Sequence, residues 1–261
     1  MLTSKQIFEF ETNGYVVIPD LLNSVETDLL AKIARQDQSL QQLRTSRTDG
    51  EGGAVDLVVQ NSLPEDSIYG AIIRDDRIVG AMEKLLGGEV YHYHHKMILK
   101  EAKSGGAWAW HQDYGYWYHN GCLFPWMASC MIAVDRATKA NGCLQVLKGS
   151  HQIGRVDHGK VGQQTGADEE RVEAALKVCD RVYVELEPGS AVMFHCNTLH
   201  RSDQNTSEDP RWAFICCYNA ARNSPYKESK HPSYSLLEKW SRERIVGVGQ
   251  KQLERLSSAD H

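Results

Sequence analysis

The stretch from Ala128 to Leu147, ASCMIAVDRATKANGCLQVL, shows the pattern on which the fold prediction rests. Two apolar runs, Ala128–Val134 and Cys143–Leu147, have the length and composition of buried strands. Between them, Asn141 and Gly142 can supply the positive φ angles of a tight turn, so we expect a hairpin here. Short apolar strands separated by turn residues are typical of a β-sandwich or barrel.

The same pattern continues on both sides of this stretch. From Val90 onward the apolar spacing changes from helical to extended, and Pro188-Gly189 supplies a second turn. The other predicted strands are Val90–Leu99, Trp108–His111, Val182–Glu187, Ala191–His195 and Trp212–Tyr218. Together they predict a mainly β fold with flanking helices, of the jelly-roll or cupin-like type.

The part before Val90 is predicted to be mostly helical. Thr3 and Gln6 resemble a capping box at the start of a helix, and Gly14 stands where a left-handed C-terminal stop belongs. A short strand and two further helices are predicted at Tyr15–Ile18, after Asn23 or Ser24, and between Asp75 and Gly87.

Two polar segments are predicted to lie outside the regular core. Thr45–Ser62 is polar and contains glycines, so we expect a mobile loop. Arg155–Asp180 is expected to form a polar loop and then a short helix opened by Asp168, and such an excursion between strands is a lid candidate. We expect one domain over residues 1–261, with a helical part (1–89), a jelly-roll core (90–220) and a carboxy-terminal extension (221–261).

The composition is that of a globular protein, with 41% hydrophobic and 24% charged residues. A net charge of −5 without a long basic run argues against nucleic acid as a partner, so we expect a small-molecule substrate and no obligate protein partner. No apolar run is long enough to span a bilayer, and the amino terminus does not resemble a signal peptide, so we expect a cytoplasmic protein. The seven cysteines are expected to be reduced and structural, because their number is odd and they form no CxxC pair.

His111-Gln112-Asp113, at the end of a predicted strand, is the central functional observation. Side chains at positions i and i+2 of an extended segment point to the same face, so His111 and Asp113 can bind one metal ion together. His200, just beyond another predicted strand, can supply a third ligand. Two imidazoles and one carboxylate leave the other coordination positions open for a 2-oxo acid and dioxygen, as in non-haem iron(II) oxygenases.

Arg211 supports this interpretation. A guanidinium at the start of an apolar strand can bind the far carboxylate of 2-oxoglutarate through two hydrogen bonds, a geometry that Lys does not reproduce. Ser202 is placed to add a hydroxyl donor. An exposed Arg211, following Asp209-Pro210, is the alternative.

Three runs of sequence, in order, resemble the phytanoyl-CoA dioxygenase family of iron(II)- and 2-oxoglutarate-dependent oxygenases. They are WHQDYGYWY at 110–118, ANGCLQVLKGSH at 140–151 and PGSAVMFHCNTLHRSDQNTSEDPR at 188–211. The sequence GYVVI at 14–18 is similar to the family's amino-terminal signature. Lys148 departs from the proline that members usually carry before Gly-Ser-His, and the chain after Tyr226 matches nothing in this pattern.

The resemblance implies a double-stranded β-helix that holds Fe(II) through His111, Asp113 and His200. It also implies that Arg211, with help from Ser202, anchors 2-oxoglutarate. Related iron halogenases carry a small residue in place of the carboxylate. The presence of Asp113 therefore indicates a hydroxylation, or another two-electron oxidation such as desaturation.

Aromatic residues crowd around the same motif. Trp117 is expected to contact substrate, because similar ectoine hydroxylases carry Trp at the same distance from the first metal-binding His. His92 and His94 are expected to share a strand face, with His94 lining the pocket. Lys96 and Lys100 follow on that strand, where they can reach a substrate carboxylate or the cosubstrate, or can instead protect a solvated edge strand.

Two other functions remain open at this stage. One is a catalytically silent, cupin-type protein that binds a metal or a metabolite, and the other is a zinc or manganese cupin enzyme that uses no 2-oxo acid. Arg211 argues against the second. No basic cluster suits the phosphates of coenzyme A, so a compact, amino-acid-like or natural-product-like metabolite is the expected substrate of a hydroxylase.

Overall fold

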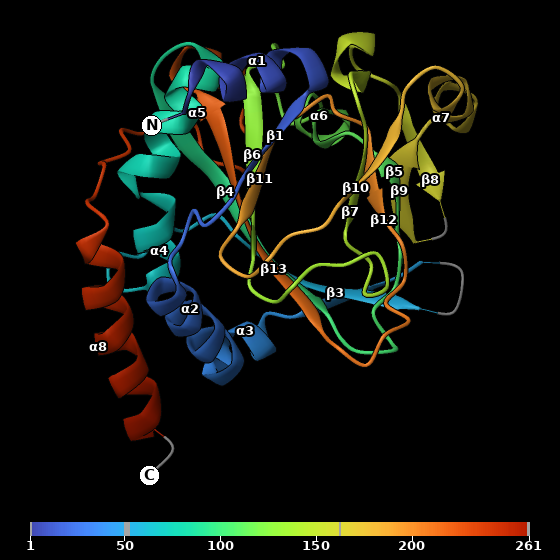
Figure 1. Ribbon diagram of the computed structural model, residues 1–261. Helices are drawn as coiled ribbons and strands as arrows, with labels where there is room; N and C mark the ends of the chain where they lie inside the picture. The colour runs from blue at the N-terminus through green and yellow to red at the C-terminus, as the bar shows by residue number, and fades with distance from the viewer. Residues whose placement is uncertain (1, 50–52, 162, 260–261) are drawn as a thin grey trace.

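The computed structural model describes residues 2–49, 53–161 and 163–259. Its centre is a seven-stranded sheet facing a four-stranded sheet, with a separate two-stranded sheet nearby (Figure 1). In spatial order the large sheet contains β1 (Tyr15–Ile18), β11 (Ala191–His195), β6 (Met127–Ala133), β13 (Arg211–Ala220), β4 (Val90–Lys100), β3 (Ala54–Gln60) and β2 (Thr45–Thr48). The small sheet contains β10 (Arg181–Val184), β7 (Leu144–Leu147), β12 (His200–Ser202) and β5 (Trp108–His111), and β8 (His158–Val161) pairs with β9 (Gln164–Ala167).

Helices cover the outer face of the large sheet. Figure 1 shows α2 (Ser24–Gln36), α4 (Ile68–Ile73), α5 (Asp76–Leu86) and α8 (Glu243–Ala259) on that side, opposite the small sheet. The other α-helices of the described residues are α1 (Ser4–Asn13), α3 (Gln38–Gln42), α6 (Asp113–Trp117) and α7 (Glu169–Leu176). The predicted mainly β fold with flanking helices is confirmed. Among the described helices, none has the length and apolar character needed to cross a membrane.

Alternation along β13 divides the interior into two cores. Phe214, Cys216 and Tyr218 pack toward the helices, whereas Ala213, Ile215 and Cys217 pack between the two sheets. Successive side chains of a strand point to opposite faces, so a strand buried on both faces is apolar throughout. The large sheet therefore forms one wall of the space between the two sheets.

The predicted helix ends in the amino-terminal part are confirmed. Thr3 and Gln6 form a complete capping box at the start of α1, and Gly14 ends that helix at a φ of 81°. Asn23 and Glu26 form a second capping box at the start of α2. These local signals set where each helix begins and where the chain turns toward the sheet.

The prediction of a mobile loop at Thr45–Ser62 was wrong. Most of this segment forms β2 and β3, which pair with each other and extend the large sheet beside β4; residues 50–52 lie outside the described residues. Val55 and Leu57 alternate along β3 and are buried. This alternation predicts a strand, although the polar residues around it suggested a loop. The polar loop expected after Arg155 is also wrong for 158–161 and 164–167, which pair as β8 and β9. Asp168 does cap α7, as expected.

The hairpin predicted at Asn141-Gly142 does not form. β6 belongs to the large sheet and β7 to the small one, so this turn lies in a crossing between sheets. Gly142 has a φ of 76°, and a Cβ there would lie 2.4 Å from the carbonyl oxygen of Asp203. Glycine is therefore required both for the backbone conformation and for the close approach.

A bulge in β4 overturns the expectation that His92 and His94 share a face. The pairing with β13 shifts between Cys217 and Tyr218, which stand opposite His94 and His92. Because a bulge inserts one extra residue into β4, His92 and His94 lie on opposite faces of the sheet. His92 points toward the helices, where its Nε2 lies 3.1 Å from Nδ1 of His95, and His94 points between the sheets.

Candidate metal and cosubstrate site

His111, Asp113 and His200 come together between the sheets. β5 and β12 are neighbours in the small sheet, and His111 stands directly opposite His200, with ring centroids 4.0 Å apart. One ligand atom from each of the three residues lies within 4.8 Å of the other two. The spacing that suggested a shared face thus places two imidazoles and a carboxylate around one point.

Backbone carbonyls orient both imidazoles. Nδ1 of His111 lies 2.8 Å from the carbonyl oxygen of Ala109, and Nδ1 of His200 lies 2.9 Å from that of Thr198. Each Nδ1 therefore carries the proton, and each Nε2 has a free lone pair for a metal. Burial lowers the pKa of both rings, which favours the neutral form that binds metal.

Gln112 sets the position of Asp113. Its backbone is extended (φ −115°, ψ 137°) and Asp113 then begins the short helix α6. The Gln112 side chain is buried and donates to the carbonyl oxygens of Gly154 and Asn197 over 2.8 and 2.7 Å. This glutamine therefore fixes the bend by which the chain leaves the strand and presents the carboxylate to the two rings.

The Asp113 carboxylate is held in its charged form. Burial acts to raise its pKa, but the Lys96 ammonium and the two imidazoles outweigh burial and bring the pKa below its usual range. Nζ of Lys96 lies 3.5 Å from Oδ1. An ionised carboxylate beside two neutral imidazoles is a donor set suited to ferrous iron.

A cavity of about 240 Å³ opens in front of this group. Arg211 and Ser202 line it together with the three residues of the metal group. Arg211 is 3% exposed; one guanidinium nitrogen donates to the carbonyl oxygen of Gly142 over 2.8 Å, whereas the buried Nε has no partner. A buried guanidinium with an unused donor fits the distal carboxylate of 2-oxoglutarate.

Lys100 lies behind the end of the cavity formed by Arg211 and Ser202 and is not part of the cavity lining. Its fully buried ammonium donates to Oγ of Ser202 over 2.9 Å and to the carbonyl oxygen of Asp203. Burial, together with the neighbouring charge of Arg211, lowers the pKa of Lys100 well below its usual value. Lys100 can therefore orient the Ser202 hydroxyl but does not face the cavity itself.

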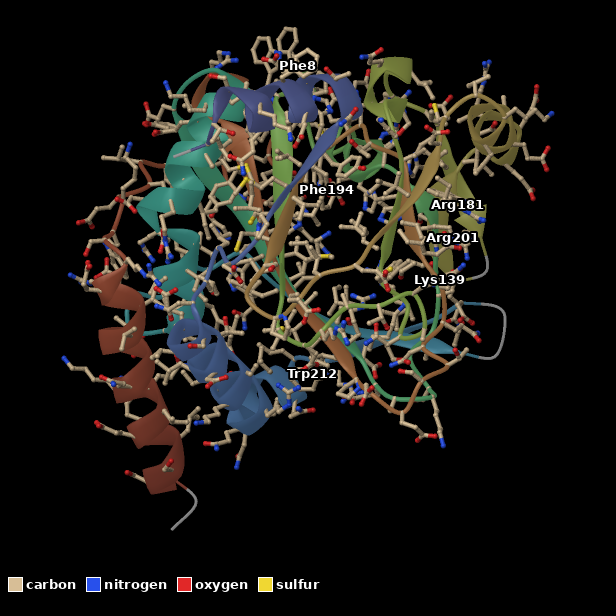
Figure 2. All side chains as sticks on the ribbon, in the orientation of Figure 1. Phe8, Lys139, Arg181, Phe194, Arg201 and Trp212 are labelled. Carbon is tan, nitrogen blue, oxygen red and sulfur yellow. The ribbon has the colours of Figure 1, made fainter. Side chains whose placement is uncertain are left out.

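The three residues expected to contact substrate all line the cavity: Trp117, His94 and Lys96. The ring of Trp117 meets that of His94 edge to face, with centroids 5.6 Å apart. Phe194 forms part of the floor; it lies between the sheets, as Figure 2 shows, with its ring centroid 4.9 Å from that of His200.

Sequence reasoning missed other residues in the cavity wall. Arg47 comes from β2, within the supposed loop, and His231 comes from the carboxy-terminal extension. The alternation Ala54–Gln60 was a signal for the β2–β3 pair. No pattern in the sequence indicated that residue 231 would return to the site.

Comparisons with known proteins agree with this geometry. The family model for phytanoyl-CoA dioxygenase (PhyH) matches residues 10–213. The chain is 34% identical over 183 residues to an L-proline trans-4-hydroxylase of Streptomyces griseoviridis, covering 64% of this chain and 68% of the relative. It is 28% identical over 250 residues to an ectoine dioxygenase of Halomonas elongata, covering 88% and 74%.

Solved structures share the fold. EctD from S. alaskensis with 2-oxoglutarate and 5-hydroxyectoine superposes with a TM-score of 0.77 at 21% identity, over 92% of this chain and 88% of that one. The non-haem α-ketoglutarate-dependent carbocyclase SnoK from nogalamycin biosynthesis gives a TM-score of 0.69 at 21% identity, over 90% and 97%. The predicted jelly-roll fold is confirmed.

The family match extends over most of the chain and includes all three residues of the metal group. The predicted enzyme class, a 2-oxoglutarate-dependent non-haem iron dioxygenase, is confirmed with it. The solved EctD structures of the same fold contain Fe or 2-oxoglutarate, the two cofactors expected from the sequence. This chain belongs to the phytanoyl-CoA dioxygenase (PhyH) family.

Proposed function

We propose that this dioxygenase hydroxylates a small, carboxylate-bearing metabolite, such as a cyclic amino acid, and releases succinate and CO2. The observation that carries the proposal is one cavity of about 240 Å³ that joins the metal group and Arg211 to a wall of aromatic and cationic side chains. The volume of this cavity suits a compact metabolite.

His111, Asp113 and His200 are the proposed metal ligands, and Arg211 with Ser202 is the proposed 2-oxoglutarate anchor. When bound, ferrous iron and 2-oxoglutarate together supply the chemistry that activates dioxygen for a two-electron oxidation. The chain itself holds the reacting groups in position and excludes water from between the sheets, where Leu144 and Phe194 line the cavity.

Charge favours an anionic substrate. Among the described residues that line the cavity, Arg47, Lys96, Arg201 and Arg211 are cationic, and Asp113 is the carboxylate. The charges of ferrous iron and the 2-oxoglutarate dianion cancel, so the loaded site keeps an excess of positive charge. Arg47 is exposed and lies over the Trp108 ring, 5.8 Å from its centroid, where it can attract an anion toward the cavity.

The aromatic side chains in the cavity wall favour a compact cyclic substrate. Trp108, Tyr116 and Trp117 line the cavity on the side of β5 and α6. Aromatic walls contribute apolar contact area without consuming hydrogen bonds. A relative that is named an L-proline trans-4-hydroxylase supports a substrate of this class.

The test is a succinate-release screen with Fe(II) and 2-oxoglutarate over cyclic and acyclic amino acids, including L-proline, and ectoine. We expect succinate release coupled to a product that gains one oxygen atom; a product that loses two hydrogens would identify a desaturase instead. His111→Ala should neither bind iron nor turn over. His119→Ala, which changes an exposed histidine near the motif, is the matched control.

Two outcomes would contradict the proposal. Metal and metabolite binding without succinate release, across the whole panel, would identify a silent binding protein. Activity with zinc or manganese in the absence of 2-oxoglutarate would identify a different cupin enzyme.

We also propose a cytoplasmic location. All seven cysteines are free, although Cys130 and Cys216 stand opposite each other on neighbouring strands. Free thiols throughout a chain are typical of reducing compartments.

A further inference from the structure

A segment beyond the family match forms part of the cavity wall. The family model ends at residue 213, whereas His231 lies in the stretch between β13 and α8. The His231 ring lines the cavity and stacks on Tyr93, with centroids 4.7 Å apart and an angle of 20° between planes. It also lies 5.1 Å from the ring of His94.

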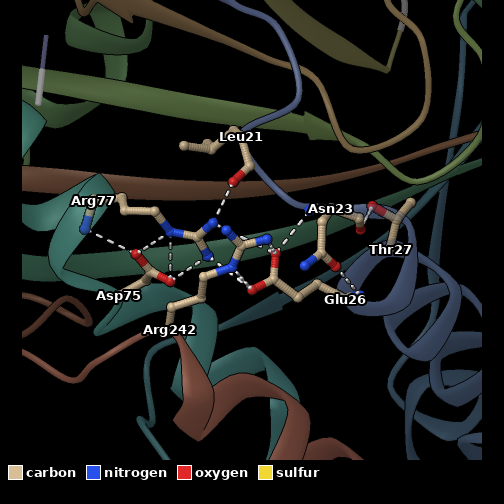
Figure 3. A network of polar contacts seen from close by, with 7 residues as sticks. All are labelled: Leu21, Asn23, Glu26, Thr27, Asp75, Arg77 and Arg242. Carbon is tan, nitrogen blue, oxygen red and sulfur yellow. Dashed lines mark hydrogen bonds and ion pairs between the residues drawn. The ribbon is translucent and has the colours of Figure 1, made fainter.

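Contacts on both sides hold this segment in place. Before it, Asn223 donates to the carbonyl oxygen of Phe124 over 2.7 Å. After it, Arg242 donates from Nε to the buried carboxylate of Glu26 over 2.9 Å, in the network shown in Figure 3. Next to His231 itself, Asn61 donates to the carbonyl oxygen of Lys230 over 2.6 Å. The position of His231 is therefore fixed by the fold.

One ring nitrogen in each of His94 and His231 makes no hydrogen bond. Nδ1 of each ring is buried without a partner. A buried N–H without an acceptor is rarer in proteins than an unused acceptor, so the proton of each neutral ring belongs on Nε2. Each ring then offers one N–H donor that can reach the cavity.

Both rings are neutral near physiological pH. Burial, and next the charge of Lys96, lowers the pKa of each. A neutral imidazole N–H beside an ammonium can bind a carboxylate without adding further charge to the site.

We propose that His231 is a specificity-determining residue that, paired with His94 and next to Lys96, binds the carboxylate of the substrate. This inference rests on the proposed hydroxylase function and assigns the recognition of the substrate's anionic group. The carboxylate would lie on the Tyr93 side of the cavity, and the rest of the molecule would extend along Trp117 toward the metal group. A residue outside the family match thus determines which substrate is bound, whereas the residues inside the match carry the reaction common to the family.

The test compares His231→Phe and His231→Ala with wild type and with His119→Ala. Phenylalanine keeps the stacking on Tyr93 and removes the hydrogen bond. The effect of the lost hydrogen bond is therefore separated from any effect of unfolding. The probes are L-proline and L-prolinamide, or the acid and amide of whichever panel compound is turned over. Steady-state succinate release gives kcat and KM for each.

We expect His231→Phe to raise the KM for the acid about tenfold, which is the value of one charge-assisted hydrogen bond, and to leave kcat and the KM for 2-oxoglutarate nearly unchanged. The preference for acid over amide should fall by a similar factor. The control should behave as wild type.

An unchanged KM and an unchanged preference for acid over amide in His231→Phe, with an active wild type, would refute this inference alone. An inactive wild type across the whole panel would instead refute the proposed function, and this inference with it.

Discussion

Ser129 donates a hydrogen bond from its hydroxyl to Oδ2 of Asp113 over 2.8 Å. The serine lies on β6 of the large sheet and is fully buried, whereas Asp113 follows a strand of the small sheet. This contact ties the two sheets together at the metal group. It also fixes one carboxylate oxygen while Lys96 approaches the other.

Ser129→Ala should therefore weaken iron binding. We expect the affinity for Fe(II) to fall about tenfold, because removing a group that orients a ligand typically costs 10–100-fold in metal affinity. Anaerobic titration with Fe(II) measures the change. Ser190→Ala removes a buried serine that accepts from Asp20, remote from the metal group, and should leave the affinity unchanged. Equal affinities in Ser129→Ala and wild type would show that the hydrogen bond does not orient the ligand.

Lys100→Met should raise the KM for 2-oxoglutarate about tenfold and leave iron affinity unchanged. Lys100 holds the Ser202 hydroxyl at the cavity end where Arg211 has an unused donor, so its loss affects cosubstrate anchoring rather than the metal. Steady-state kinetics with varied 2-oxoglutarate measure the effect, and Ser202→Ala should reproduce it. The exposed Lys139→Met is the control. An unchanged KM would show that Lys100 serves packing alone.

The metal group could be predicted from sequence because it depends on short-range geometry. His111 and Asp113 are two residues apart, and the extended backbone of Gln112 between them directs both side chains toward the same point, although Asp113 itself begins α6. Two strands, Trp108–His111 and Ala191–His195, have the predicted bounds. Other predicted ends were displaced: the strand expected at Val182–Glu187 runs from Arg181 to Val184.

The errors concern residues whose positions depend on partners far away in the sequence. The bulge that separates His92 from His94 arises in the pairing of β4 with β13, and period-two alternation does not reveal it. β3 pairs with β4, which lies about thirty residues later in the chain, and β2 pairs with β3. His231 reaches the cavity because Asn61 holds the carbonyl oxygen of the neighbouring Lys230 and because its own ring stacks on Tyr93, and no local pattern encodes these contacts.

Stability should fall as the pH drops below about 6.5. Burial lowers the pKa of His95 to about 4 and, with the charge of His95, lowers that of His92 to about 3. The unfolded chain therefore binds protons near pH 6.5 that the native state takes up only near pH 4 or below, so the free energy of unfolding decreases over this interval. Above about pH 6.5 these two residues add no pH dependence.

Urea unfolding at a series of pH values measures this effect. His95→Gln removes one of the two groups and can still hydrogen-bond to Gln60, which His95 meets at 3.1 Å. Its slope between about pH 6.5 and 4 should be shallower than that of wild type, by up to about 1.4 kcal/mol per pH unit. Parallel curves for the two proteins would exclude His95 as a source of acid sensitivity.

Glu26→Ala should destabilise the fold far more than Arg242→Ala. The Glu26 carboxylate is fully buried and receives hydrogen bonds from Arg77, Arg242 and the backbone of Asn23 (Figure 3). Its loss leaves Arg77 without one of its two carboxylate partners, at a cost of about 3 kcal/mol. The Arg242 side chain is 44% exposed, so water replaces its contacts and its removal should cost about 1 kcal/mol or less.

Urea unfolding near neutral pH distinguishes the two variants, and Glu187→Ala, which breaks an exposed pair with Arg136, gives the baseline for a surface contact. Equal losses in Glu26→Ala and Arg242→Ala would mean that the pair acts as one unit. If Arg242→Ala loses little stability, the segment that carries His231 should also keep its position, because Trp240 still anchors it through a hydrogen bond to the carbonyl oxygen of Arg74. The KM for substrate should then not change in Arg242→Ala.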